Sequence, residues 1–168
     1  GLDRAGVEVR ADGSIPVDEY SRTNVDSVFA VGDITHRINL TPVAIHEGHA
    51  FADTQFGGKP RPVDHAFVPS AVFSQPPVGT VGYPEEEAGH HYGALDVYRS
   101  EFKPMRHTLA GREEKALMKL LVERAGGRVV GLHVVGPDAP EIVQGFAVAV
   151  KCGLTKEQFD STIGIHPT

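Results

Sequence analysis

The sequence of 168 residues contains one cysteine, Cys152, and no long hydrophobic run. A single cysteine excludes an internal disulfide and a cysteine-based zinc site, and because no signal peptide is visible we expect a reducing, cytoplasmic setting. No apolar run approaches the ~20 residues of a membrane-spanning helix. The 16 lysines and arginines are scattered and the formal net charge is −6. We therefore expect neither nucleic acid nor membrane as a partner.

Hydrophobic residues make up 40% of the sequence, enough to bury a core in one domain or in parts of two. Residue 1 is glycine rather than methionine, and the C-terminal residues carry no charged tail. These features predict a fragment of a longer protein.

The N-terminal third carries two features typical of a ligand site. Residues 27–33 form an apolar run that ends in Gly-Asp, which predicts a buried parallel strand opening onto a ligand crevice. Asp33 is placed there to accept hydrogen bonds from sugar-like hydroxyls, although a simple turn after the strand is the alternative. Thr41 is the expected N-cap and Pro42 the first residue of a helix over residues 43–56. Free N–H groups at this helix start suit an anionic or carbonyl-bearing ligand.

Three separated stretches resemble one family. Residues 23–33 together with Leu-Thr-Pro-Val-Ala-Ile at 40–45 resemble the second flavin-contacting segment of the pyridine nucleotide-disulfide oxidoreductases, and most closely their glutathione reductase branch. Residues 71–82 are similar to the start of that family's dimerisation domain, and residues 164–168 to its His-Pro-Thr motif. Because these matches occur in order over nearly the whole chain, the resemblance is specific.

The resemblance implies an α+β fold in two parts. Residues 1–63 would be the C-terminal end of an FAD-binding α/β domain, and residues 64–168 a dimerisation domain, an antiparallel sheet with helices, truncated after the His-Pro-Thr motif. A polar linker at residues 57–62 precedes the boundary. In the second part, hydrophobic patterns and turn signals predict strands at 70–74, 78–83, 95–102, 115–123 and 128–135, and helices that start at Pro84 and at capping boxes in 138–141 and 155–158.

The family resemblance also implies the cofactors, FAD and NADPH. Asp33 and the neighbouring Gly32 would contact the flavin's ribityl or phosphate-linked groups, and the helix start at Leu40, Thr41 and Pro42 would face the pyrimidine edge of its ring. In this family the flavin passes electrons to a cysteine pair that attacks a disulfide substrate. Neither a cysteine pair nor a Gly-x-Gly-x-x-Gly motif is present in this sequence, so we expect the fragment alone to be inactive.

His166 is the expected catalytic residue. By resemblance, it protonates the leaving thiolate in the active site of the other subunit of a homodimer, with glutathione disulfide as substrate; histidine suits this role because its unperturbed pKa is about 6.5. The glutamate that normally follows the His-Pro-Thr motif and orients the imidazole is not in this sequence.

The expected substrate contacts are Met105, His49 and Thr168. Met105 falls where glutathione reductases contact substrate across the dimer, but a core methionine that fills a gap is as good an interpretation. His49 stands where many glutathione reductases carry an arginine. This departure leaves open a related enzyme of the trypanothione reductase or dihydrolipoamide dehydrogenase type, and an isolated non-catalytic dimerisation module is a third hypothesis.

Other residues have simpler interpretations. His46, His49 and Asp53 share one helix face, which we interpret as solvated, so no metal site is expected. Cys152 is expected to be a small packed side chain at a helix C-terminus and not a nucleophile. Gln75-Pro76 and His166-Pro167 are candidate cis peptides by resemblance.

Overall fold

The computed structural model describes residues 1–166, and the chain forms two compact units. The first unit is Gly1–His65 and the second extends from Ala66 onward. The division falls beside Asp64, where the sequence analysis places the domain boundary. Within the described residues, no helix is both long and apolar enough to cross a membrane.

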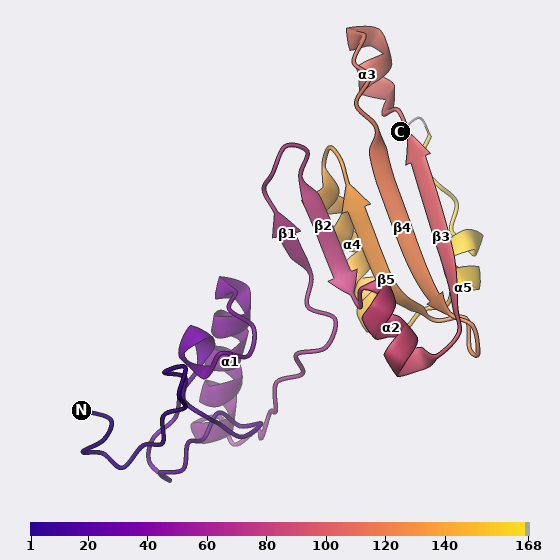
Figure 1. Cartoon of the computed structure of the whole chain (residues 1–168). Helices are drawn as coiled ribbons and strands as arrows, with labels where there is room; N and C mark the ends of the chain where they lie inside the picture. The colour runs from indigo at the N-terminus through magenta and orange to yellow at the C-terminus, as the bar shows by residue number, and fades with distance from the viewer. Residues whose placement is uncertain (167–168) are drawn as a thin grey trace. The chain divides into compact units, whose positions relative to one another are not determined.

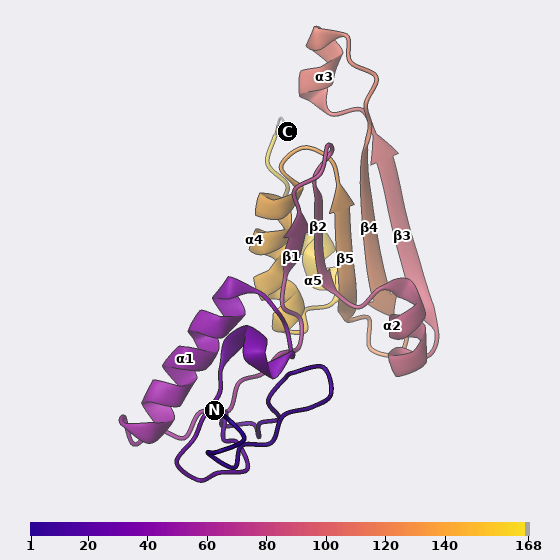
Figure 2. The same cartoon turned by 60° about the vertical axis from the view of Figure 1, so that its left-hand side comes forward.

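The first unit contains two helices, which are joined to the rest of the unit by turns and extended chain (Figures 1 and 2). A 3₁₀ helix, η1, spans Gly32–Thr35, and the helix α1 spans Thr41–Gln55. The predicted N-cap is wrong by one residue: Leu40 is the N-cap of α1 and makes no side-chain capping hydrogen bond. Thr41 and Pro42 lie in the first turn, where the missing N–H of proline leaves no helical hydrogen bond unmade.

The buried parallel strand predicted for residues 27–33 is not formed. Phe29 makes a single antiparallel bridge with Arg22, and the chain then turns into η1. A strand needs neighbours to which its backbone can hydrogen-bond, and among residues 1–166 only Arg22 pairs with this run. Two apolar side chains of the run, Val28 and Ala30, nevertheless pack in a small core with Val7, Ile15, Val17 and Val25.

The second unit is a five-stranded sheet with helices on both faces, so the predicted α+β class is confirmed (Figure 1). The strand order is β1-β2-β5-β4-β3, and every neighbouring pair is antiparallel. The strands are β1 Ser70–Val72, β2 Val78–Gly82, β3 Leu95–Phe102, β4 Ala116–Glu123 and β5 Val129–Val135. The helices are α2 Glu85–Tyr92, α3 Met105–Ala110, α4 Ala139–Lys151 and α5 Lys156–Ser161.

The two faces of the sheet are covered by different helices. Helix α4 packs lengthwise on one face, and α2 covers one end of the other (Figures 1 and 2). Alternation along the strands supplies an apolar side chain to each face in turn. The core under α4 contains Val81, Leu132, Val134, Val143, Ala147 and Val150. The smaller core under α2 contains Ala88, Leu121 and Val130.

One of the two predicted capping boxes is present. At α5, Thr155 accepts from the Gln158 N–H and the Gln158 side chain accepts from the Thr155 N–H, as predicted. At α4 the prediction is wrong: Asp138 has φ 62° and makes no capping hydrogen bond. An N-cap normally has extended backbone. The left-handed conformation instead turns the Asp138 carboxylate to Arg106, 2.8 Å away.

Candidate functional site

The turn η1 is held in one conformation from several directions. Gly32 has φ 75°, and a Cβ added to it would lie 3.0 Å from the Cβ of Ala44 in α1. The Thr35 hydroxyl donates to the Gly32 carbonyl at 2.8 Å, and Ile15 N–H donates to the Ile34 carbonyl at 2.8 Å. Glycine alone combines this positive φ with so close an approach. The turn therefore presents the exposed Asp33 on a fixed backbone.

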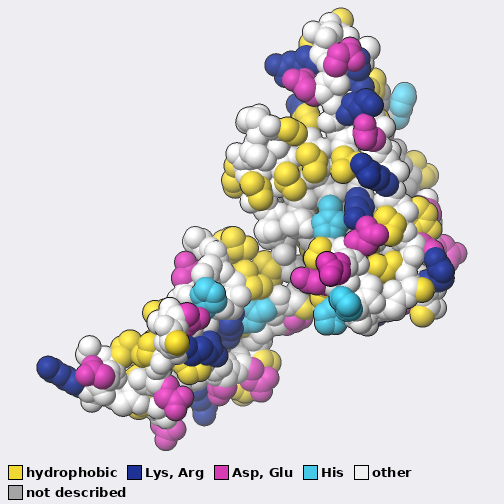
Figure 3. Space-filling model, in the orientation of Figure 1, with side chains coloured by type: hydrophobic (Ala, Val, Ile, Leu, Met, Phe, Trp, Pro, Cys, Tyr) yellow, Lys and Arg dark blue, Asp and Glu magenta, His cyan; other side chains and the backbone are white. Residues whose placement is uncertain are grey.

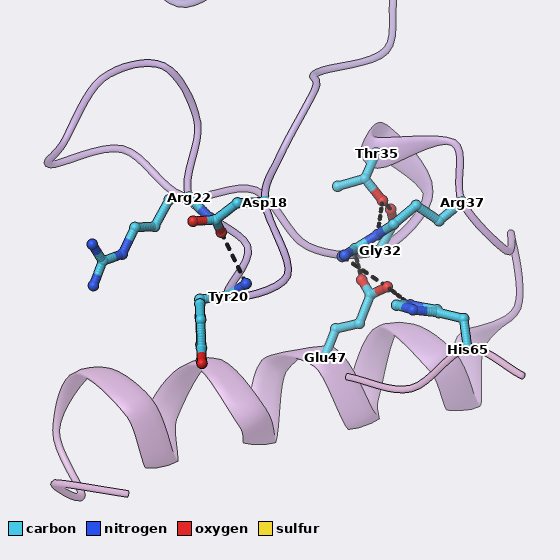
Figure 4. Close-up of polar contacts among 8 residues, drawn as sticks. All are labelled: Asp18, Tyr20, Arg22, Gly32, Thr35, Arg37, Glu47 and His65. Carbon is cyan, nitrogen blue, oxygen red and sulfur yellow. Dashed lines mark hydrogen bonds and ion pairs between the residues drawn. The ribbon is translucent and has the colours of Figure 1, made fainter. Parts of the chain in front are cut away.

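Glu47 of α1 supports this turn from below (Figure 4). Its side chain is 1% exposed, and its Oε2 accepts a hydrogen bond of 2.6 Å from the Gly32 N–H. Its Oε1 lies 2.7 Å from His65 Nε2 and 2.8 Å from Arg37 Nη2. Burial by itself raises the pKa of Glu47, but the hydrogen bonds from Gly32 and His65 and the positive charge of Arg37 outweigh it, and the pKa lies below its ordinary value. The carboxylate is therefore ionised at neutral pH.

The start of α1 lies next in the chain and offers hydrogen-bond donors. Leu40 supplies no side-chain cap, and within the described part of the chain nothing accepts a hydrogen bond from the Thr41 N–H. Thr41 and Pro42 are exposed, whereas Leu40 is half-buried. The positive end of the helix dipole adds to the free N–H group, so this position favours a carbonyl oxygen or an anion.

These groups fit a cofactor that carries hydroxyls and carbonyls. The exposed Asp33 carboxylate is a hydrogen-bond acceptor and the Thr41 N–H is a donor, while the buried Gly32 belongs to the turn that carries Asp33. Roles in FAD binding for Gly32, Asp33, Leu40, Thr41 and Pro42 remain predictions on these grounds.

The three residues considered for a metal site have other neighbours. Arg61, in the segment after α1, lies 2.8 Å from Asp53 Oδ2 and 3.3 Å from His46 Nε2. His49 is exposed on α1. Across residues 1–166, no group of three or more histidine, cysteine, aspartate or glutamate side chains is placed to hold a metal ion.

Met105 is not a core methionine. It is the first residue of α3 and is 61% exposed, which excludes the gap-filling interpretation. It lines a cavity of about 490 Å³ together with Phe102, Met118 and Ile142, between the end of β3 and α4. Nearby, the Gln75-Pro76 peptide bond is cis, as the resemblance predicts.

The C-terminal candidates are only partly described. His166 is the last described residue and is exposed. Thr168 and the His166-Pro167 bond lie outside the described residues, so the predictions for them stay untested. The prediction for Cys152 as a packed side chain is wrong: it is the C-cap of α4 and is exposed. Its position after the last helical turn accounts for the difference.

Sequence reasoning missed Glu47 together with Arg37 and His65. Glu47 lies four residues after the buried Val43 and three before the buried Ala50, which is the spacing of one helix face. A glutamate on the buried face of a helix needs partners, since an unpaired charge there is costly. That signal was in the sequence, but its partners belong to segments on either side of the helix.

Comparison with known proteins finds similarity along the whole chain. Residues 68–168 match the family model of the pyridine nucleotide-disulphide oxidoreductase dimerisation domain, and residues 1–48 match the pyridine nucleotide-disulphide oxidoreductase model. A glutathione reductase of Burkholderia cepacia is 56% identical over 100% of this chain and 37% of its own length. The chloroplastic/mitochondrial glutathione reductase of Pisum sativum is 55% identical over 100% of this chain and 30% of its own.

A second group of relatives carries a different name. A trypanothione reductase of Leishmania donovani is 47% identical over 99% of this chain and 34% of its own length. The chain thus spans about a third of the length of the curated relatives it matches. Because the dimerisation-domain model alone covers more than half of the chain, the chain belongs to the pyridine nucleotide-disulfide oxidoreductase family.

Proposed function

We propose that the chain is part of an FAD-dependent glutathione-disulfide reductase, which uses NADPH to reduce glutathione disulfide to two molecules of glutathione. The observation that carries the proposal is the arrangement of the first unit, in which the exposed Asp33 of the turn η1 is followed in the chain by the uncapped start of α1 at Thr41. The similarity to two glutathione reductases along the entire chain supports it.

The first unit would supply flavin contacts. FAD, when bound, supplies the chemistry that carries electrons from NADPH toward a disulfide. The Asp33 carboxylate accepts hydrogen bonds from hydroxyl groups, and the Thr41 N–H donates to a carbonyl oxygen. Leu40 and Pro42 flank that N–H, and the dipole of α1 favours negative charge at the same place.

His166 would act as the acid of the disulfide step. When a thiolate attacks a disulfide, one S–S bond breaks, a new one forms, and the second sulfur leaves as a thiolate with the electron pair. The His166 imidazolium donates its proton to that sulfur, so that a neutral thiol leaves. His166 is exposed, which suits a residue that acts on a neighbouring subunit. Met105, His49 and Thr168 would contact the substrate.

The second unit would form the interface of a homodimer. Helix α4 is apolar on more than the side that meets the sheet: Val143 and Ala147 are buried, whereas Phe146 and Val148 are 44% and 66% exposed. An exposed apolar helix side of this kind favours a protein partner, and the match to a dimerisation domain makes a second copy the partner we propose. We further propose that the protein works in the cytoplasm.

Two observations keep a second candidate in view, a trypanothione-disulfide reductase. Relatives with that name are 47% and 46% identical to this chain. His49 is also not the arginine expected for a glutathione carboxylate.

By itself the chain holds only one cysteine, so we propose that the isolated polypeptide is a non-catalytic dimerisation module.

The test is an absorption spectrum of the purified full-length protein, followed by anaerobic NADPH and then glutathione disulfide. A flavin spectrum that NADPH bleaches and glutathione disulfide restores would support the proposal. A flavin that NADPH bleaches and only trypanothione disulfide restores would move the substrate to the second candidate. A protein without flavin would contradict both.

A further inference from the structure

We infer that Glu47 is a positioning residue for the cofactor site, because its buried carboxylate fixes the turn that presents Asp33. The inference rests on the proposed function, since it requires FAD to bind beside Asp33. It adds a residue that does not itself face the cofactor and that sequence reasoning did not single out.

One carboxylate joins three segments of the first unit (Figure 4). Oε2 accepts from the Gly32 N–H in η1, at 2.6 Å. Oε1 meets Arg37, from the loop between η1 and α1, at 2.8 Å, and His65, from the segment after α1, at 2.7 Å. Glu47 itself is on α1, whose first turn carries the free Thr41 N–H. The turn and the helix start are therefore tied together through a single side chain.

The ion pair joins the fully buried Glu47 carboxylate to Arg37, whose side chain is 22% exposed but whose Nη2 atom is shielded from water. Arg37 Nη2 is buried, and among the described residues no acceptor has hydrogen-bond geometry toward it, although Glu47 Oε1 lies 2.8 Å away. Among residues 1–166, Glu47 is thus the one carboxylate that forms an ion pair with Arg37. Removing one partner of such a pair leaves the other uncompensated, whereas replacing both with apolar side chains of similar size is far less costly.

The hydrogen bond to Gly32 bears directly on Asp33. Glycine adopts positive and negative φ about equally, so steric preference alone does not select the observed φ of 75° at Gly32. The hydrogen bond from the Gly32 N–H to Glu47 holds it. Without the carboxylate, the Gly32 N–H loses its acceptor and the following residue, Asp33, is no longer held at one orientation to Thr41.

The experiment compares FAD affinity with stability in the full-length protein. The apoprotein of each variant is titrated with FAD, and thermal unfolding is recorded with and without FAD. Glu47→Ala should weaken FAD binding by roughly tenfold or more, the size of one lost charge-assisted hydrogen bond. Asp53→Asn is the matched control, because Asp53 is a carboxylate on the same helix that pairs with Arg61 and not with the turn; its FAD affinity should equal that of the wild type.

A double variant separates positioning from stability. Arg37→Met with Glu47→Leu replaces the ion pair by apolar side chains of similar size and leaves no unpaired charge, so the apoprotein should unfold at a higher temperature than Glu47→Ala. It still removes the acceptor of the Gly32 N–H, so FAD binding should fall as in Glu47→Ala. This variant also keeps the test available if Glu47→Ala does not fold.

Asp33→Ala distinguishes the two ways of failing. If Asp33→Ala weakens FAD binding but the double variant binds FAD as tightly as the wild type, Glu47 has only a structural role and the inference is overturned while the proposed function stands. If the wild-type protein binds no FAD, the proposed function fails and this inference fails with it.

Discussion

The hydroxyl of Thr80 lies 2.6 Å from Nδ1 of His133, directly across the pairing of β2 with β5. The other ring nitrogen, Nε2, lies 3.1 Å from the carbonyl of Tyr83, where β2 ends. In the neutral ring with its proton on Nε2, Thr80 donates to Nδ1 and Nε2 donates to Tyr83. The imidazole thus joins three points of the sheet while uncharged.

This arrangement predicts a pH dependence of stability. Burial lowers the pKa of His133, and the charge of Lys119 lowers it further, against the hydrogen bond to the Tyr83 carbonyl, which raises it. Lys119 is itself paired with Glu85, 2.5 Å away. Because the folded pKa lies below the unfolded value of about 6.5, the unfolded state binds the proton first. The stabilisation of the folded protein by the neutral His133 ring is fully present above pH ~6.5 and is lost as the pH falls through the folded pKa of His133.

An NMR titration of the His133 ring in the folded protein should give a pKa below 6.5. Unfolding midpoints recorded from pH 5 to pH 8 should rise with pH more steeply in the wild type than in His133→Gln, which cannot titrate. Equal pH slopes for the two proteins would show that His133 does not contribute.

Close packing of β2 on α4 leads to a second prediction. A Cβ at Gly79 would lie 2.6 Å from the Ala139 carbonyl oxygen and 2.8 Å from Val143 Cγ2. Gly79→Ala should therefore lower the free energy of unfolding by roughly 1–3 kcal/mol, because strand and helix must separate. Urea unfolding of the full-length protein measures it.

Gly89→Ala is the matched control for this change. Gly89 lies in α2, and a Cβ there meets nothing within 4 Å. The same substitution should leave stability unchanged or raise it by up to about 1 kcal/mol, since alanine favours a helix more than glycine does. A Gly79→Ala protein as stable as Gly89→Ala would contradict the packing argument.

Local patterns in the sequence were enough to predict the strands of the second unit. Alternation between two faces and turns at the ends predict all five strands, and their antiparallel pairing agrees with what the family resemblance implies. The box at Thr155 was equally local, because its two partners are three residues apart. Helix α3 was missed, since its large apolar residues Met105 and Leu109 face solvent while the polar His107 is buried, so the segment shows no apolar periodicity.

Features that depend on distant partners were beyond the sequence. The run at residues 27–33 has the composition of a buried strand, but strand formation requires neighbours, and within the described part of the chain only Arg22 forms a bridge with it. Asp138 follows the pattern of an N-cap, yet its backbone is left-handed and its carboxylate meets Arg106, 32 residues away along the chain. The role of Glu47 likewise depends on Arg37 and His65.

The acid role of His166 gives a third prediction. In the full-length protein, His166→Ala should lower turnover of glutathione disulfide by roughly a hundredfold or more, the scale of a lost general acid. Flavin content and flavin reduction by NADPH should be retained, because neither step needs this proton. Stopped-flow absorbance separates the two half-reactions.

His90→Ala is the control for His166→Ala. His90 is an exposed histidine in the last turn of α2. Its removal should change neither half-reaction. Unchanged turnover in His166→Ala would remove His166 from the mechanism.

Hydrophobic and charged side chains are separated on the face of the second unit opposite α4. Figure 3 shows hydrophobic side chains gathered over β1 and β2 on the face opposite α4, while charged side chains follow β3 and β4. The charges there are largely paired, as Lys119 is with Glu85 and Lys115 with Glu101. These charges are therefore largely neutralised by one another.

His49→Arg tests whether this position selects the substrate. Arginine adds a permanent charge and two parallel donors for a carboxylate, so KM for glutathione disulfide should fall several-fold with kcat nearly unchanged, the result of uniform binding. Trypanothione disulfide should respond less or in the opposite sense. Gln55→Arg adds the same charge at the end of α1, six residues further along and on another side of the helix, and should leave both KM values unchanged. Equal effects of the two substitutions would mean that net charge alone acts, and no effect of His49→Arg would remove this position from substrate binding.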